Sequence, residues 1–173
     1  EDPQAKDTPM RVAKSFVNDL VHSLHNPEPK ITEFDNGEKY DGIVAQCNIP
    51  VKSLCAHHHL PITGFAHAAY IPRPESKIIG LSKLNRIVQY WSRRPQTQEH
   101  CTMQIHKAIS DHVKDNEGVA VVIHASHMCC SHRGIQHDSE MHTARVSGAF
   151  HDKNDRSRDE FYRMIAVAIK QHR

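Results

Sequence analysis

Four strand-like segments and the helical patterns between and around them most constrain what this chain can fold into. Alternating and β-branched residues predict strands over residues 43–54 and 62–71, and a continuous apolar run predicts another over 119–125. Residues 141–150 are typical of a fourth strand, which we expect to pair with the third. Two helical patterns separate the second strand from the third, and one lies at each end of the chain. This order favours an α+β fold with a mainly antiparallel sheet.

The helices are predicted from apolar residues that recur every three or four positions. The first begins at Thr8-Pro9, which combines a capping side chain with a first-turn proline, and the proline-containing stretch 26–29 ends it. Ser82 and Thr97 are capping residues in front of the two central helices. The four predicted helices cover residues 7–25, 82–91, 98–113 and 157–170.

Size and charge exclude several classes of function. The chain has 173 residues, which fits one domain. Its 22 Lys and Arg residues against 20 Asp and Glu residues give a net charge of +2, without the basic excess of a nucleic-acid-binding protein. No apolar run approaches the roughly 20 residues that cross a bilayer, and the charged start carries no signal-peptide core. We therefore expect a cytoplasmic protein that binds neither nucleic acid nor membranes.

The chain contains 16 histidines and five cysteines, which is an unusual supply of metal ligands. Histidine is the commonest metal ligand and the side chain that titrates nearest neutral pH. Five cysteines cannot all pair within one chain, so reduced thiols in an intracellular protein are the simpler interpretation. We expect some of these thiols to bind a metal ion.

Two clusters combine the two ligand types. Cys55-Ala56-His57-His58 places a thiolate and an imidazole three positions apart, where the first two predicted strands meet. His127-Met128-Cys129 supplies another such pair just after the third. Zinc accepts both ligand types; three protein ligands with an open position are typical of catalytic zinc, whereas four make a structural site. Besides Cys55, spacing leaves six candidate ligands open: His57, His58, His59, His127, Cys129 and Cys130.

Five segments, taken in order, resemble the GTP cyclohydrolase I family. They are residues 8–14 (TPMRVAK), 55–58 (CAHH), 80–88 (GLSKLNRIV), 93–99 (RRPQTQE) and 127–134 (HMCCSHRG). The resemblance extends over nearly the whole chain and implies one domain over 1–173, with an N-terminal helical segment, 1–30, and a catalytic core, 43–173. It also implies the tunnelling fold, an antiparallel four-stranded sheet with helices on one face and an N-terminal helix. Such sheets join into a pentameric barrel, and two pentamers stack into a homodecamer.

The resemblance also implies a reaction. This is zinc-dependent hydrolysis of GTP to 7,8-dihydroneopterin triphosphate and formate, the first step of folate, pterin or deazaguanine biosynthesis. A zinc-activated water would attack C8 of guanine with acid–base help from histidine, and ribose opening and closure of the pterin ring would follow. Histidine suits these proton transfers because its pKa lies near neutral pH.

Carried over position by position, the resemblance chooses among the candidate ligands. It implies that Cys55, His58 and Cys129 bind zinc, which leaves His57 and His127 free beside the metal. His127 would protonate N7 of guanine, so that the base accepts electron density. His57 would be a second proton carrier, with orientation of the metal water as the alternative.

The remaining implied roles concern recognition of GTP. Glu99 would read guanine, because one carboxylate accepts hydrogen bonds from both N1–H and the exocyclic amine, and adenine lacks those donors. Ser82 would relay a proton during ribose opening. In this family the sites lie between subunits. The residues implied to hold the triphosphate are Ser82, Lys83, Arg86, Arg133, Arg11 and Lys14.

Some positions depart from the family pattern and keep other functions open. Ala56 stands where members often carry Glu, which affects the expected rate and pH optimum more than metal binding. The alternatives are an enzyme of this fold that stops at the ring-opened formyl intermediate or makes a cyclic phosphate, a nitrile reductase, and a zinc-stabilised module without catalysis. Histidines outside the motifs are interpreted as surface residues; examples are His100, His106, His112, His124, His137 and His142.

Overall fold

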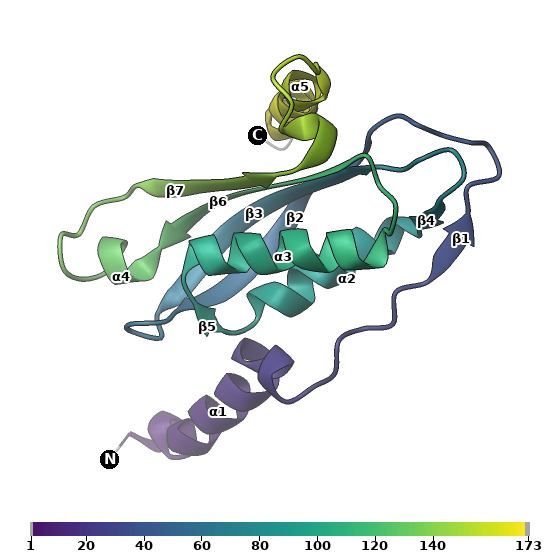
Figure 1. The fold of residues 1–173 in the computed structure, drawn as a ribbon. Helices are drawn as coiled ribbons and strands as arrows, with labels where there is room; N and C mark the ends of the chain where they lie inside the picture. The colour runs from purple at the N-terminus through teal and green to yellow at the C-terminus, as the bar shows by residue number, and fades with distance from the viewer. Residues whose placement is uncertain (1, 172–173) are drawn as a thin grey trace.

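A five-stranded sheet forms the centre of the protein, with helices on both of its faces (Figure 1). The computed structural model describes residues 2–171. The strand order is β5 (Pro95–Gln96), β2 (Val44–Cys55), β3 (Pro61–Ile71), β6 (Gly118–His127) and β7 (Glu140–Val146). All neighbours are antiparallel except β5, which runs parallel to β2. The four predicted strands are confirmed, and the predicted four-stranded sheet is wrong by one strand, since two-residue β5 is too short to show a periodic pattern.

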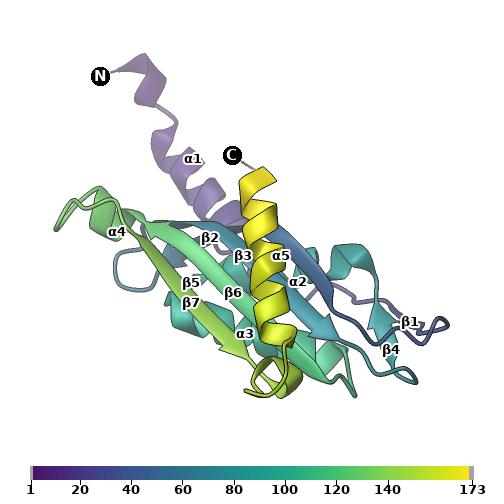
Figure 2. The same ribbon diagram turned by 90° about the horizontal axis from the view of Figure 1, so that it is seen from above.

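Helices α2 (Leu81–Ser92) and α3 (Gln98–His112) cover one face of the sheet. Helix α5 (Ser157–Gln171) crosses the opposite face (Figure 2). Its Phe161 and Ile165 belong to an apolar cluster that also includes Ala69 and Ala120 of the sheet. The prediction of helices on one face is therefore wrong for α5. The central strands explain the difference, because β6 buries side chains on both of its faces and both need cover.

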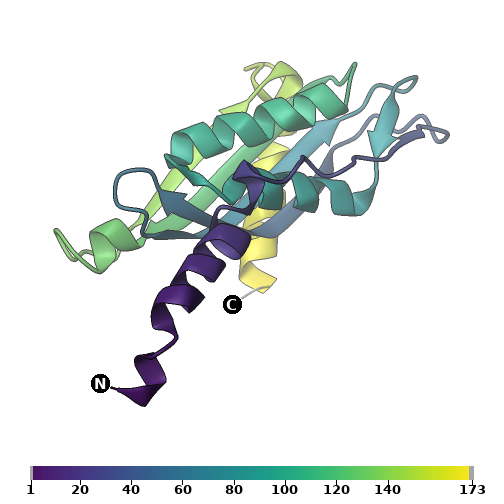
Figure 3. The same cartoon turned by 90° about the horizontal axis from the view of Figure 1, so that it is seen from below.

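The N-terminal segment is less regular than predicted. In place of one helix over 7–25, a short turn (Pro3–Ala5) is followed by α1 (Thr8–Ser15), a π-helical turn (Phe16–Leu20) and a 3₁₀ turn (His22–Leu24). Asp7, rather than Thr8, occupies the capping position and makes no side-chain cap. Helix α1 extends away from the sheet (Figure 3).

Short elements complete the chain. β1 (Glu33–Asp35) pairs with β4 (Lys77–Ile79) in a separate two-stranded sheet that precedes α2. The capping position of α2 is Gly80, so the prediction of Ser82 as the cap is wrong. Helix α4 (Met128–Ser131) follows β6, and a 3₁₀ turn (Gly148–Phe150) occupies the end of the fourth predicted strand. No helix among residues 2–171 is long and apolar enough to cross a membrane.

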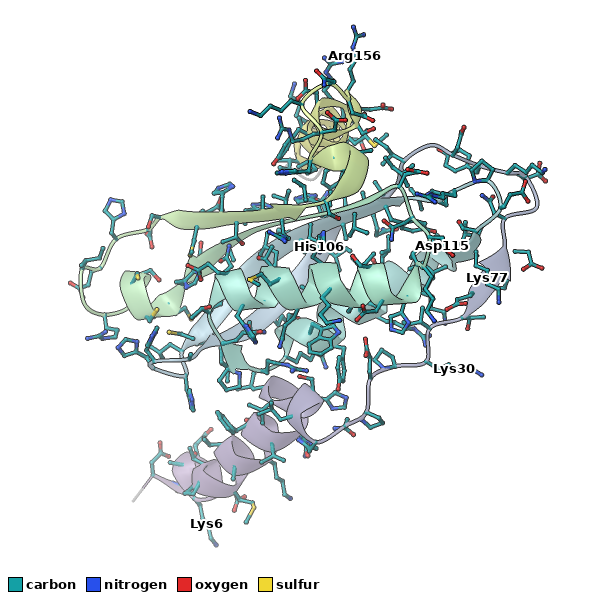
Figure 4. The ribbon with its side chains drawn as sticks, viewed as in Figure 1. Lys6, Lys30, Lys77, His106, Asp115 and Arg156 are labelled. Atoms are coloured by element: carbon teal, nitrogen blue, oxygen red, sulfur yellow. The ribbon has the colours of Figure 1, made fainter. Side chains whose placement is uncertain are left out.

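Polar contacts at the start and in the middle of α3 attach the helix to the side of the sheet that carries β7. His106 lies between the helix and the sheet (Figure 4), with Nε2 3.0 Å from Oγ of Ser147. At the start of the helix, Nε2 of Gln98 donates to Oγ1 of Thr143 at 3.1 Å. His106, His112 and His124 are half-buried and His67 is buried, so the prediction that the histidines outside the motifs are surface residues is wrong for these residues.

Candidate active site

Cys55, His58 and Cys129 come together where strands β2 and β6 end and β3 begins. Each offers one ligand atom, and these atoms all lie within 4.8 Å of one another. Cys55 is buried, Cys129 is half-buried and His58 is exposed, so the group is open to solvent on one side. Two thiolates and an imidazole suit zinc, and three protein ligands leave a position for water or substrate. The donor set therefore fits a zinc ion.

Strand pairing explains why these ligands meet, although 74 positions (129 − 55) separate the first from the last. β2 ends where β3 begins, with Leu54 opposite Pro61. β6 ends beside the same end of β3, with Ile62 opposite His127. The ends of β2 and β6 thus flank the start of β3. Cys55 is the last residue of β2 and Cys129 follows β6 directly, so the two thiols lie at the same end of the sheet.

A tight turn after β2 holds two histidines near the first thiol. The backbone N–H of His59 donates to the carbonyl of Cys55, and the N–H of Cys55 donates to the carbonyl of Leu60, both at 2.8 Å. His59 adopts a left-handed conformation, with φ of 51°. The Nδ1 atoms of His57 and His58 lie 3.7 and 3.9 Å from Sγ of Cys55.

The two thiols differ in acidity. Burial raises the pKa of Cys55, but hydrogen bonds from the side chains and backbone of His58 and His57 outweigh burial and lower it to about 6. Burial raises the pKa of Cys129 to about 11, with further increases from the adjacent Cys55 and Cys130. One thiolate therefore forms readily, whereas a second needs the positive charge of a metal ion.

His127 lies at the end of β6, against the first turn of α3. Its Nε2 is 2.8 Å from Oε1 of Gln98. Burial lowers the pKa of His127, and the charge of Glu99 opposes this shift. Glu99 is exposed and lines a surface pocket between α3 and β7. The structure thus brings the implied guanine reader near the implied N7 acid, which precedes the ligand Cys129 by two positions.

Arg133 contacts the metal group directly. Its Nη1 donates to Nε2 of His58 at 3.1 Å. Because a guanidinium can only donate, Nε2 of this ring accepts and Nδ1 carries the proton, facing Sγ of Cys55. A neutral imidazole that bound a metal ion through Nδ1 would carry its proton on Nε2, which could then no longer accept from Arg133.

The other implied triphosphate residues lie on α2 and α1. Ser82, Lys83 and Arg86 lie in the first turns of α2, whose opposite end leads to β5 beside Cys55. The ten helical steps from Ser82 to Ser92, the end of the helix, span about 15 Å. On α1, Arg11 and Lys14 are exposed, and the described contacts of Arg11 include an ion pair with Asp7 at 3.7 Å.

Comparison with known proteins decides the family. A sequence profile of GTP cyclohydrolase I matches residues 1–166. The chain belongs to the GTP cyclohydrolase I family. It is therefore an enzyme, a hydrolase.

Individual relatives agree with this assignment. GTP cyclohydrolase 1 of Flavobacterium johnsoniae is 46% identical over 154 residues, which are 87% of this chain and 67% of the relative. The enzymes of Aeromonas salmonicida and Erwinia tasmaniensis are 42% and 40% identical, covering 92% and 95% of this chain and 72% and 74% of their own. Among solved structures, an archaeosine synthase QueF-Like in the apo form aligns with a TM-score of 0.48 and 16% identity, over 62% of this chain and 94% of its own.

Two features of the site in this member of the GTP cyclohydrolase I family could not be predicted from the sequence. The contact between Gln98 and His127 joins residues 29 positions apart, and no spacing pattern signals it. Alternation of side chains along a strand would place Cys130 on the opposite side from Cys129, but both belong to α4 and Cys130 is exposed. The chain leaves the strand conformation at Met128, so alternation of side chains ends there.

Proposed function

We propose that this protein hydrolyses GTP to 7,8-dihydroneopterin triphosphate and formate at a zinc site formed by Cys55, His58 and Cys129. The observation that supports this most is the convergence of these ligands beside His57 and His127, in a chain of the GTP cyclohydrolase I family. The reaction would open folate, other pterin or deazaguanine biosynthesis.

A zinc ion held there would supply a Lewis acid that lowers the pKa of a bound water to about 7. The chain's part is to hold two thiolates and one imidazole and to leave the remaining side accessible, which the exposure of His58 supports. His57 is exposed and lies 3.7 Å from the thiol of Cys55, so it can orient water or carry a proton at the same place.

Protonation of the base is the proposed task of His127. Water adds to C8 of guanine, and the imidazole ring of the base accepts the electron pair more readily when N7 is protonated. His127 is half-buried, and burial lowers its pKa, while the negative charge of Glu99 opposes that shift and supports the proton-donating form. Opening of the ring and loss of C8 as formate would follow, with His57 as a second proton carrier. Ser82 would relay a proton as the ribose opens, before the pterin ring closes.

Recognition of guanine is the proposed task of Glu99. Its carboxylate can accept hydrogen bonds from N1–H and the exocyclic amine of guanine, two donors in the geometry of a bidentate contact. Glu99 lines the pocket between α3 and β7 together with Thr102, Met103 and Arg145. A base bound in that pocket would lie on the side of α3 where the carboxylate influences His127.

Binding of the triphosphate is proposed to need a second subunit. Ser82, Lys83 and Arg86 lie at the far end of α2 from Cys55, and a neighbouring subunit would bring such side chains to the metal group. β7 is an outer strand of the sheet and offers its free edge to a neighbouring copy. We propose the pentameric barrel of the tunnelling fold, stacked into a homodecamer, with Arg133, Arg11 and Lys14 completing the triphosphate site.

We propose a cytoplasmic location and a single catalytic domain, with 1–30 as the helical segment and 43–173 as the core. The state of the thiols supports the location, since Cys47, Cys55, Cys101, Cys129 and Cys130 are all free. Free thiols persist in a reducing compartment, where GTP is also available.

The test is incubation of zinc-loaded protein with GTP, followed by formate and by pterin absorbance and fluorescence after oxidation. Formate and pterin that both disappear with His127→Ala would support the full reaction. A formylated, ring-opened product without pterin would show an enzyme that stops early. Bound zinc and bound GTP with no product at all would overturn the proposal in favour of a non-catalytic binding module.

A further inference from the structure

We propose that Gln98 is a positioning residue that fixes one tautomer and one orientation of His127. The inference rests on the proposed function, in which His127 moves a proton. Gln98 is the first residue of α3 and is only 3% exposed, so water does not compete for its amide group. Its side chain bridges three elements, since its partners lie on β6 and β7 as well as at the metal site.

The amide nitrogen of Gln98 is fixed toward the sheet. Nε2 lies 3.2 Å from the carbonyl oxygen of Ile123, 2.9 Å from that of Met141 and 3.1 Å from Oγ1 of Thr143. Backbone carbonyls only accept hydrogen bonds. If the amide were turned over, Oε1 would face two carbonyl oxygens with no hydrogen between them. The nitrogen therefore belongs on this side and Oε1 on the other.

Two threonine hydroxyls fix the direction of the same network. Oγ1 of Thr102 donates to the backbone carbonyl of Gln98 at 2.8 Å, which uses its only hydrogen. In its 2.7 Å contact with Thr143, Thr102 must then accept, and Thr143 must donate. Oγ1 of Thr143 keeps lone pairs for the amide nitrogen of Gln98. The donor and the acceptor are therefore assigned for each of these hydrogen bonds.

The position of the proton on His127 follows from this. Oε1 of Gln98 can only accept, and its partner at 2.8 Å is Nε2 of His127. Nε2 must therefore carry a hydrogen in the neutral ring as well as in the cation. Nδ1 is left as the atom that gains and loses the second proton. When the cationic ring gives that proton to N7 of guanine, the ring becomes neutral with its Nε2–H still bonded to Gln98.

This arrangement prepares the ring for one reaction. A neutral histidine without such a partner divides between two tautomers and can rotate about its terminal torsion. Removal of a group that orients a metal-binding histidine typically costs about 10-fold to 100-fold in metal affinity or activity, and we expect an effect of the same size for the group that orients His127. The first turn of α3 thus serves two purposes, because Gln98 points to the sheet and His127, whereas Glu99 lines the pocket.

The chain offers a matched control in Gln96. This glutamine is also buried, at 5% exposure, and its Nε2 donates to the backbone carbonyl of Trp91 at 2.7 Å. Its Oε1 has no hydrogen-bond partner among the described residues. Gln96→Met and Gln98→Met each remove an amide that bonds to backbone, but only Gln98→Met removes an acceptor from His127.

The kinetic test compares these variants as zinc-loaded proteins. We expect Gln98→Met to lower kcat for formate release about 10-fold to 100-fold, with zinc content and KM for GTP unchanged, and Gln96→Met to lower only the melting temperature. An equal loss of kcat in Gln96→Met would overturn the inference.

A second measurement does not need turnover. In ¹⁵N-histidine-labelled, zinc-loaded protein, with His127 assigned by comparison with His127→Ala, we expect the neutral ring to carry its proton on Nε2. The same signal should persist in Gln96→Met and become a mixture of tautomers in Gln98→Met. A proton on Nδ1 in the unsubstituted protein overturns the inference whatever the activity. Absence of formate, with Nε2–H present, overturns the proposed function and leaves the inference about the ring standing.

Discussion

The backbone N–H of Asn48 donates a hydrogen bond to Nδ1 of His67, at 3.3 Å. Asn48 has a left-handed φ of 55° and lies where the pairing of β2 with β3 shifts register. The bulge leaves this N–H without a strand partner, and the fully buried His67 supplies one. To accept this bond, Nδ1 must stay unprotonated, so His67 is a structural partner of the backbone that has to remain neutral.

The stability of the protein should therefore fall in mild acid. Burial lowers the pKa of His67 to about 4, with a further contribution from the nearby His124, against about 6.5 in the unfolded chain. Between these values the unfolded chain binds a proton that the folded protein does not, so this part of the stability is complete above pH 6.5 and is lost as the pH falls toward 4. From pH 7 to pH 5 the loss should be about 2 kcal/mol.

Comparison with His67→Gln isolates this effect. Glutamine keeps an acceptor for Asn48 but does not titrate, so the variant should lose about 2 kcal/mol less of its free energy of unfolding over the same pH range. Urea denaturation of both proteins at pH 7 and pH 5, at one zinc concentration, measures the difference. Parallel pH profiles would show that His67 does not titrate as described.

Metal content should depend on Cys55 and Cys129 and not on their neighbour Cys130. Cys55→Ser and Cys129→Ser each remove a thiolate from a three-ligand site, so bound zinc should fall from about one ion per chain to less than about a tenth. Cys130 is exposed on α4, and Cys130→Ser should keep its zinc. Elemental analysis of the purified proteins checks this, and loss of zinc in Cys130→Ser would point to a different ligand set.

Zinc affinity should rise with pH in two stages. Both thiols must lose a proton to bind, and hydrogen bonds from His58 and His57 lower the pKa of Cys55 to about 6 against burial, whereas burial raises that of Cys129 to about 11. Near pH 8 the thiol of Cys129 is the ligand that still has a proton to release, so the logarithm of the association constant should increase by about one per pH unit. Below pH 6 the slope should be steeper, because Cys55 and the imidazole of His58 must then lose a proton as well. Chelator competition across pH 5–8 measures both slopes, and a constant affinity would contradict the assignment.

Selectivity for guanine should depend on the charge of Glu99. Glu99→Gln replaces a carboxylate by an amide whose NH₂ group cannot accept from guanine, so kcat/KM for GTP should fall about 100-fold. Glu160→Gln is a matched control, because Glu160 is an exposed acid in the first turn of α5. Steady-state kinetics and melting temperatures of both variants check this. A similar loss in the control would mean that a general loss of negative charge is responsible.

Subunits with different defects should restore each other's activity. In the proposed assembly one active site takes Lys83 from one subunit and His127 from another. Co-expressed Lys83→Ala and His127→Ala chains should therefore recover about a quarter of the activity, since about a quarter of randomly mixed sites have both residues intact. Formate release by purified mixed oligomers measures this. Activity no higher than that of either parent would place both residues in one chain's site.

The sequence predicts the parts of the fold that repeat a local pattern. The strands β2, β3 and β6 begin and end within two residues of their predicted limits, because alternating or continuous apolar residues mark them. The two residues of β5 carry no such pattern, and neither does the position of α5, which depends on small side chains at Ala69 and Ala120 on the far face of the sheet. These features depend on contacts between distant segments.

The site, too, combines features that the sequence predicts with features that depend on contacts between distant segments. The ligand group implied by the resemblance, Cys55, His58 and Cys129, does come together, and its roles in binding and catalysis stay predictions. The hydrogen-bond partner of His127 could not be predicted, because Gln98 lies beside it only when α3 packs on β6 and β7 at one particular position along the strands. Spacing along the chain contains no information about that position.

The separation of 74 positions between the outer ligands also has a consequence for how the chain acquires its metal. The thiols of residues 55 and 129 meet only when β3 has paired on one side with β2 and on the other with β6. Closing so long a loop is entropically costly before the sheet exists, so the site cannot assemble from local structure alone. Zinc uptake should therefore be a late event in folding, and a nascent chain still short of residue 129 has no complete place to hold the ion.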